Sequence, residues 1–184
     1  LEEHQIIGNI TDFLKETDVL VIDIPPGLRR EFSTSLEMTF VNKVKILIPF
    51  IEKSGVQKVI FVSSTSVYGD NFPIVEITEE TKPNPDTESG KQLVIAETLL
   101  QSNSHCKTTV IRFGGLLGDD RHPIKFLAGR TNVANPDAPV NMIQREDCIG
   151  IIEEILKQVQ HDNWEWNQTF NAVAPQHPTR KAYY

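Results

Sequence analysis

One stretch decides the fold: Val59-Ile60-Phe61-Val62-Ser63-Ser64-Thr65-Ser66-Val67-Tyr68-Gly69-Asp70. Its first four residues are apolar and mostly β-branched, which is typical of a strand buried on both faces of a sheet. Four small hydroxyl residues follow directly, and in an open α/β sheet ligands bind at the edge where strands end in this way. A hydroxyl there can steer a carbonyl or a sugar oxygen. The alternative is a Ser/Thr-rich turn that binds only its own backbone, and the residue types favour both interpretations equally.

Two further apolar runs predict neighbouring strands. Residues 18–24 form a run that ends at Pro25-Pro26-Gly27, because proline has no N–H to give to a strand ladder. Residues 107–113 form the next run, and the glycine-rich segment 114–118 follows it. Glycines allow a close backbone approach to a ligand, although this segment has neither the Walker spacing nor the G-x-G-x-x-G spacing of a phosphate loop.

Helical periodicity separates these runs. Helices are expected over 12–16 with Thr11 as cap, over 35–53 with Pro49 kinking or dividing the helix, over 86–103 and over 148–160, with a last strand over 168–173. Strand, helix and strand in this order imply parallel strands joined by right-handed crossovers. The sequence therefore predicts an α/β fold, a doubly wound parallel sheet in which residues 18–24, 57–63 and 107–113 lie side by side.

Length and composition suit one globular domain. The chain has 184 residues, of which 39% are hydrophobic and 23% are charged, and its formal net charge is −7. Lys and Arg are scattered, which argues against a nucleic-acid partner. No apolar run reaches the ~18 residues that span a bilayer, and no signal peptide opens the sequence. Cys106 and Cys148 are isolated, so we expect a cytoplasmic protein with no membrane partner and no metal site.

The segment from Val62 to Gly69 resembles the Ser/Thr segment of the extended short-chain dehydrogenase/reductases. That family includes the NAD(P)-dependent nucleotide-sugar epimerases and dehydratases. In it, the small hydroxyl residue four positions before the tyrosine of the VYG triplet binds and polarises the substrate, and Ser64 occupies this position. The tyrosine of this triplet is not the family's catalytic base.

Four other segments are similar to family motifs in the family's order. They are Gly8-Asn9-Ile10-Thr11-Asp12, the Pro25-Pro26 turn, Arg112-Phe113-Gly114-Gly115-Leu116-Leu117-Gly118 with Arg121, and Asn141-Met142-Ile143-Gln144-Arg145-Glu146-Asp147. The last resembles the family's IHVDD element with Gln144 in place of His. The chain is therefore identified as a member of the NAD-dependent epimerase/dehydratase family, of the nucleoside-diphosphate-sugar epimerase type.

The resemblance implies a set of site residues and a Rossmann-like fold. The cofactor is NAD or NADP in the complete protein, and the substrate is a nucleotide sugar or a similar small molecule. The implied residues are Ser64 and Lys91 for catalysis, Pro25, Pro26, Ser63, Phe113 and Gly114 for the cofactor, and Thr65, Arg121, Asn141 and Gln144 for the substrate. A homodimer is one arrangement the family allows. We expect residues 1–184 to form one incomplete NAD(P)-binding domain, with 119–145 and 174–184 contributing to a substrate-side lobe.

The sequence departs from the family pattern at two places. It lacks the first strand, G-x-G-x-x-G turn and helix, which together bind the pyrophosphate. It also lacks the tyrosine of YxxxK, which acts as general acid and base. Anchoring the helix on Lys91 places Thr87 at the tyrosine position, whereas anchoring on Glu97 places Ser89 and Leu93 at the tyrosine and lysine positions. Two functions stay open: an atypical epimerase, dehydratase or reductase, and a catalytically inactive dinucleotide-binding or scaffold protein.

Overall fold

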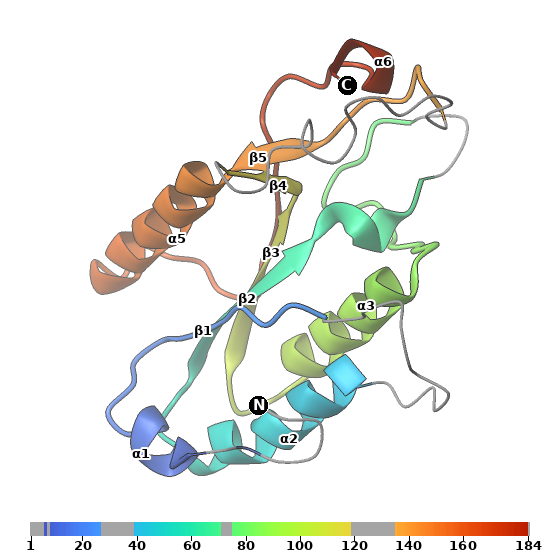
Figure 1. Cartoon of the computed structure of the whole chain (residues 1–184). Helices are drawn as coiled ribbons and strands as arrows, with labels where there is room; N and C mark the ends of the chain where they lie inside the picture. The colour runs from blue at the N-terminus through green and yellow to red at the C-terminus, as the bar shows by residue number, and fades with distance from the viewer. Residues whose placement is uncertain (1–5, 7, 27–38, 71–74, 119–134, 184) are drawn as a thin grey trace.

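The computed structural model describes residues 6, 8–26, 39–70, 75–118 and 135–183 (Figure 1). Four strands form the main sheet in the order β1-β2-β3-β6. They are β1 (Leu20–Ile22), β2 (Lys58–Ser64), β3 (Lys107–Phe113) and β6 (Thr169–Ala172). Each neighbouring pair is parallel. The predicted parallel sheet and the side-by-side placement of its first three strands are therefore confirmed.

Helices cover both faces of this sheet (Figure 1). On one face, Phe61 and Val110 pack in a core that includes residues of α2 (Thr39–Lys53) and α3 (Glu88–Gln101). On the other face, Ile60 and Ile111 pack with residues of α5 (Arg145–Gln160). Successive strand residues point to opposite faces, and both faces of the central strands β2 and β3 are covered, so residues 59–62 and 110–111 are apolar runs. This arrangement is the expected doubly wound α/β fold.

The helix near the start of the chain differs from its prediction. The short helix α1 (Ile10–Leu14) begins before the expected 12–16. Its cap is Asn9 rather than Thr11, because the Asn9 side chain accepts a hydrogen bond from the Asp12 N–H at 3.2 Å. An Asn oxygen satisfies one of the N–H groups that have no partner at a helix start, so Thr11 is free to lie inside the helix.

The glycine-rich segment after β3 contains a strand of a second, small sheet. Strand β4 (Gly115–Leu117) pairs in parallel with β5 (Met142–Gln144). Beside them, Val140 N–H donates to the Pro178 carbonyl at 2.9 Å, and Ala174 N–H donates to the Met142 carbonyl at 2.7 Å. The chain ends near α6 (Arg180–Tyr183), which lies with β4 and β5 beyond the carboxyl end of β3 (Figure 1).

In the described parts of the chain, no helix combines the length and the apolar character that a membrane span requires. The described residues also contain no group of three or more His, Cys, Asp or Glu side chains placed to hold a metal ion.

Candidate functional site

The candidate site lies at the carboxyl edge of the main sheet. Because the four strands are parallel, the segments that leave them meet at this one edge. Pro25 and Pro26 follow β1, with Pro25 exposed and Pro26 half-buried. Ser64 is the last residue of β2, Gly114 follows β3, and Ser64 is the register partner of Phe113. The fold thus brings most of the predicted site residues together from three separate strands, β1, β2 and β3.

Ser64 is half-buried and caps the short 3-10 helix η1 (Thr65–Tyr68). Its Oγ accepts a hydrogen bond from the Ser66 N–H at 3.2 Å. A hydroxyl can accept and donate at the same time, and no described residue accepts a hydrogen bond from the Ser64 hydroxyl. The turn interpretation and the ligand interpretation are therefore compatible. Thr65, the first residue of η1, is half-buried beside it.

Ser63 points to the opposite face of β2, as strand alternation requires. It is buried, and its Oγ donates to Glu97 Oε1 of α3 at 2.6 Å. The predicted cofactor contact at Ser63 is thus a position whose hydroxyl is already engaged inside the protein.

Glu97 and Arg112 form a buried ion pair between α3 and β3. Arg112 donates through Nη2 to Glu97 Oε2 at 2.6 Å and through Nε to Oε1 at 3.1 Å, and the two side chains are only 6% and 4% exposed. Burial disfavours the charged guanidinium, but the hydrogen bonds and charge of Glu97, together with Tyr68, raise the pKa of Arg112 above its ordinary value. The two-pronged contact is the strong form of an arginine–carboxylate pair.

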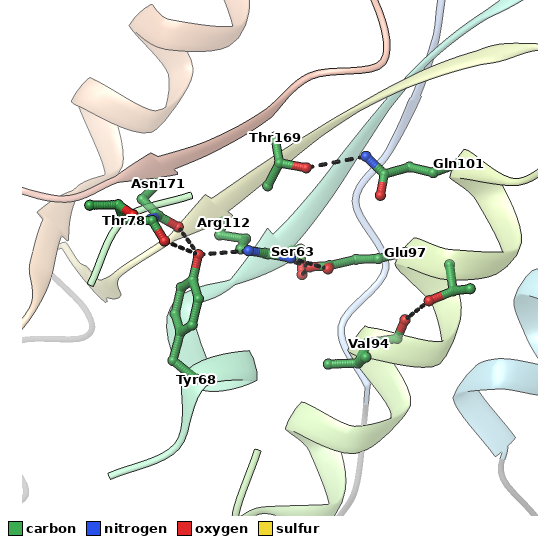
Figure 2. A network of polar contacts seen from close by, with 10 residues as sticks. Ser63, Tyr68, Thr78, Val94, Glu97, Gln101, Arg112, Thr169 and Asn171 are labelled. Atoms are coloured by element: carbon green, nitrogen blue, oxygen red, sulfur yellow. Dashed lines mark hydrogen bonds and ion pairs between the residues drawn. The ribbon is translucent and has the colours of Figure 1, made fainter. Parts of the chain in front are cut away.

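Tyr68 connects this ion pair to Asn171 of β6 and to Thr78 in the segment after η1 (Figure 2). Its hydroxyl accepts a hydrogen bond from Arg112 Nη1 at 2.6 Å. The same hydroxyl lies 2.9 Å from Asn171 Oδ1 and 3.2 Å from the Thr78 carbonyl oxygen, so it donates to this pair of acceptors. The Arg112 guanidinium carbon also lies 5.0 Å from the centre of the Tyr68 ring.

Sequence reasoning did not predict this network. The available signal was a charged residue inside each of two buried elements, Arg112 in an apolar strand and Glu97 on the inward side of a helix. Buried charges require a partner, so the two could have been paired from the sequence. Nothing in the local sequence indicated that Tyr68 and Asn171 would meet them.

The amino end of α3 packs directly against η1. A Cβ on Gly90 would lie 2.5 Å from the Ser66 carbonyl oxygen, so only glycine allows this approach. Thr87 caps the helix, because its Oγ1 accepts from the Gly90 N–H at 3.1 Å. Ser89 is half-buried, whereas Lys91 is exposed. Lys91, the second predicted catalytic residue, therefore lies on the outward side of α3.

The glycines after β3 are packed by protein atoms. A Cβ on Gly114 would lie 3.0 Å from both the Asn141 carbonyl oxygen and Val173 Cγ1. Gly115 N–H donates to the same Asn141 oxygen at 2.8 Å. These contacts hold the Asn141 backbone at the sheet edge beside Gly114. Asn141 as a whole is exposed. Gly114 and Gly115 therefore allow the close packing of the chain where β3 connects to the small sheet.

The remaining predicted residues are distributed around this edge. Phe113 is buried on the α5 face of β3. Gln144 is exposed and precedes α5 without a side-chain cap. Arg121 lies outside the described residues.

Comparison with known proteins finds a relative that matches most of the chain. No family model matches it. The chain is 34% identical over 176 residues to Protein YeeZ of Escherichia coli K12, which covers 94% of this chain and 59% of YeeZ. It thus spans about three fifths of the length of this curated relative.

Solved structures share the fold. One, from Methylobacillus flagellatus and described as a candidate NAD-dependent epimerase/dehydratase, is 29% identical with a TM-score of 0.65 and covers 78% of this chain and 50% of that one. Another is the UDP-glucuronic acid 4-epimerase of Bacillus cereus in complex with UDP-glucuronic acid and NAD. It is 16% identical with a TM-score of 0.69, and covers 94% of this chain and 59% of its own.

The parallel sheet with helices on both faces, and its hydroxyl-bearing carboxyl edge, define a Rossmann-like α/β protein. The 34% identity shows that the chain is a relative of YeeZ, and the likeness to the solved structures shows that it shares the fold of NAD-dependent epimerase/dehydratases.

Proposed function

We propose that this chain is the part of an NAD(P)-binding protein that binds, or acts on, a nucleotide sugar or a similar small molecule. The observation that carries the proposal is the placement of Ser64. Its side chain is half-buried at the carboxyl end of β2, and its oxygen is held by the Ser66 N–H. The hydroxyl hydrogen would then be directed at a substrate oxygen, whose carbonyl or hydroxyl it would orient and polarise.

The described residues fit part of a dinucleotide. Pro25 and Pro26 offer a surface at the end of β1 with no side-chain charge. Gly114, by contrast, is enclosed by Asn141 and Val173, so its missing side chain does not leave space for a cofactor. The sequence contains no G-x-G-x-x-G turn to bind the pyrophosphate. Bound NAD(P) would supply hydride transfer, and we expect the 184-residue chain alone to bind it weakly or not at all.

The proton chemistry favours the alternative of an inactive binding or scaffold protein of the same fold. Glu97 is buried against Arg112, and counting back from it places Ser89 and Leu93 where the family has tyrosine and lysine. Leu93 is buried and apolar, and a serine hydroxyl is too weakly acidic to exchange a proton at neutral pH without a base. We therefore expect little oxidoreductase or isomerase turnover. A cytoplasmic location and a homodimer stay predictions.

Two measurements test the proposal. The first is calorimetric titration of the 184-residue chain and of the full-length protein with NAD(H), NADP(H) and UDP-sugars. Binding of a UDP-sugar by the full-length protein, weakened about fivefold by Ser64→Ala, would support the role of Ser64. Micromolar NAD(P) affinity of the short chain would contradict our view of the missing phosphate turn.

The second measurement is nicotinamide absorbance of the full-length protein with a panel of nucleotide sugars. We expect turnover near background in the wild type and a gain in Ser89→Tyr, because the new phenol supplies the missing proton carrier. Strong wild-type turnover that Ser64→Ala leaves unchanged would refute both the role of Ser64 and the account of the lost base.

A further inference from the structure

Both ends of the segment from Ser63 to Tyr68 are attached to the same buried ion pair. At its start, Ser63 Oγ donates to Glu97 Oε1 at 2.6 Å. At its end, the Tyr68 hydroxyl accepts from Arg112 Nη1 at 2.6 Å. Glu97 and Arg112 bind each other through two hydrogen bonds. Ser64 therefore lies in a segment whose two ends, Ser63 and Tyr68, are each bound to one member of the pair. Figure 2 shows these two attachments.

Among the described residues, the Ser64 hydroxyl forms no hydrogen bond with Glu97 or Arg112. It faces the other side of β2, and its position depends on the backbone of η1, to which its oxygen is bound through Ser66 N–H. That backbone is fixed at its far end by Tyr68, which is 4% exposed, and in its middle by Gly90 against the Ser66 carbonyl. The direction of the Ser64 hydroxyl is thus set by residues that do not touch it.

We propose that Tyr68, Arg112 and Glu97 are positioning residues for Ser64, and that the buried ion pair holds the Ser64 hydroxyl in a ligand-ready direction. An ion pair suits this role better than apolar contact, because bidentate geometry defines a direction, whereas apolar packing tolerates small shifts. The proposal deepens the proposed function and rests on it only for the identity of the ligand.

The first test needs no ligand. In the 184-residue chain, exchange of the Ser66 amide hydrogen, followed by NMR, reports directly on the bond to Ser64 Oγ. Tyr68→Phe keeps the ring and removes the hydroxyl. The matched control is Thr108→Val, which removes a buried hydroxyl that donates to the Leu100 carbonyl at 3.1 Å near the other end of β3.

We expect Tyr68→Phe to speed Ser66 amide exchange about tenfold and Thr108→Val to change it less than twofold, because only the first variant releases η1. Unchanged exchange in Tyr68→Phe, or equal acceleration in both variants, would overturn the proposal, since a general loss of stability would then explain the effect.

The second test is a double-mutant cycle on binding of UDP-glucose to the full-length protein, measured by calorimetry. Ser64→Ala and Tyr68→Phe should each weaken binding about fivefold. In the Ser64→Ala background, Tyr68→Phe should weaken it less than twofold, because no hydroxyl remains to be positioned. Additive effects would overturn the positioning role. A wild type that binds no nucleotide sugar would refute the proposed function, and the amide exchange would still decide the positioning.

Discussion

Helices α3 and α5 cover opposite faces of the same sheet but are held to it by different chemistry. The inward side of α3 includes the buried polar residues Gln92 and Glu97. Gln92 Oε1 accepts from the Phe40 N–H of α2 at 3.2 Å, and Glu97 binds Ser63 and Arg112. The buried residues of α5 are Cys148, Ile155 and Val159. Among the described residues, side-chain hydrogen bonds from α3 to β2 and β3 therefore add to its apolar packing, whereas the buried residues of α5 contribute apolar area.

The two faces also differ in whether a buried ionisable group has a partner of opposite charge. On the α3 face, Glu97 compensates the buried guanidinium of Arg112. On the α5 face, burial above all, followed by the charge of Asp147, raises the pKa of the Cys148 thiol to about 11. A site that must orient a ligand benefits from the first kind of face, because directional bonds fix geometry, whereas apolar packing adds stability without defining direction.

The largest expected effect comes from breaking the buried pair. Glu97→Ala should lower the free energy of unfolding by about 3–5 kcal/mol, because it leaves the Arg112 guanidinium buried without a counter-charge. Urea denaturation followed by circular dichroism measures this. The double variant Glu97→Leu with Arg112→Met removes both charges and should be more stable than either single variant. A loss below about 1 kcal/mol for Glu97→Ala would mean that solvent reaches the guanidinium.

The glycines of the two helices should respond with opposite signs. Gly90→Ala should destabilise by about 1–3 kcal/mol, because its Cβ would meet the Ser66 carbonyl oxygen. Gly150→Ala in α5 should stabilise by about 0.5–1 kcal/mol, because nothing lies within 4 Å of its Cβ and alanine is the better helix former. Thermal and urea unfolding of both variants test this pair. Equal signs would contradict the close contact between α3 and η1.

The Cys148 thiol offers a smaller, pH-dependent effect. Its pKa is raised in the folded protein, so the protonated thiol stabilises the fold below its unfolded pKa near 9. That stabilisation is lost as the pH rises from about 9 to about 11. A shift of this size corresponds to about 2.7 kcal/mol, which solvent screening of the partly accessible thiol lowers to roughly 1 kcal/mol. Unfolding free energies at pH 8, 9, 10 and 11 should fall more steeply for the wild type than for Cys148→Ala. Parallel curves would show that burial does not hold the thiol neutral.

The smallest effect is expected at the solvent-facing side of α5. Lys157 Nζ lies 3.7 Å from Glu154 Oε2, and both side chains are more than half exposed. Lys157→Ala should change the free energy of unfolding by less than about 0.5 kcal/mol, because water and salt screen this pair. Comparison with Glu97→Ala in the same buffer gives the contrast between a buried and an exposed ion pair. Losses of similar size in Lys157→Ala and Glu97→Ala would contradict the expected difference between an exposed and a buried ion pair.

Much of the fold followed from local patterns. The runs that end at Ile24, Val62 and Phe113 predicted three parallel strands, because a doubly covered strand must be apolar on both sides. No local pattern in residues 114–118 predicted strand β4, because this strand forms only by pairing with β5, some 25 residues later. At the site, the place after an apolar run indicated a group of hydroxyl residues, and the resemblance to the family's Ser/Thr segment singled out Ser64. Its capping of η1 matches the turn alternative. Its supports were missed because they come from β3, α3 and β6.

The sequence by itself determined the order of strands and helices, the polar end of β2 and the absence of a tyrosine where the family's helix has one. These are properties of residue type and spacing along one segment, and hydrophobic periodicity reports them directly. Only the tertiary structure decided that Ser63 and Tyr68 are anchored to opposite members of one buried ion pair, and that Lys91 lies on the outward side of α3 while Glu97 lies inward. The physical reason is that a buried charge needs an opposite charge beside it, and only the folded chain places one there. For Arg112 this partner is Glu97, which lies 15 residues away on another element.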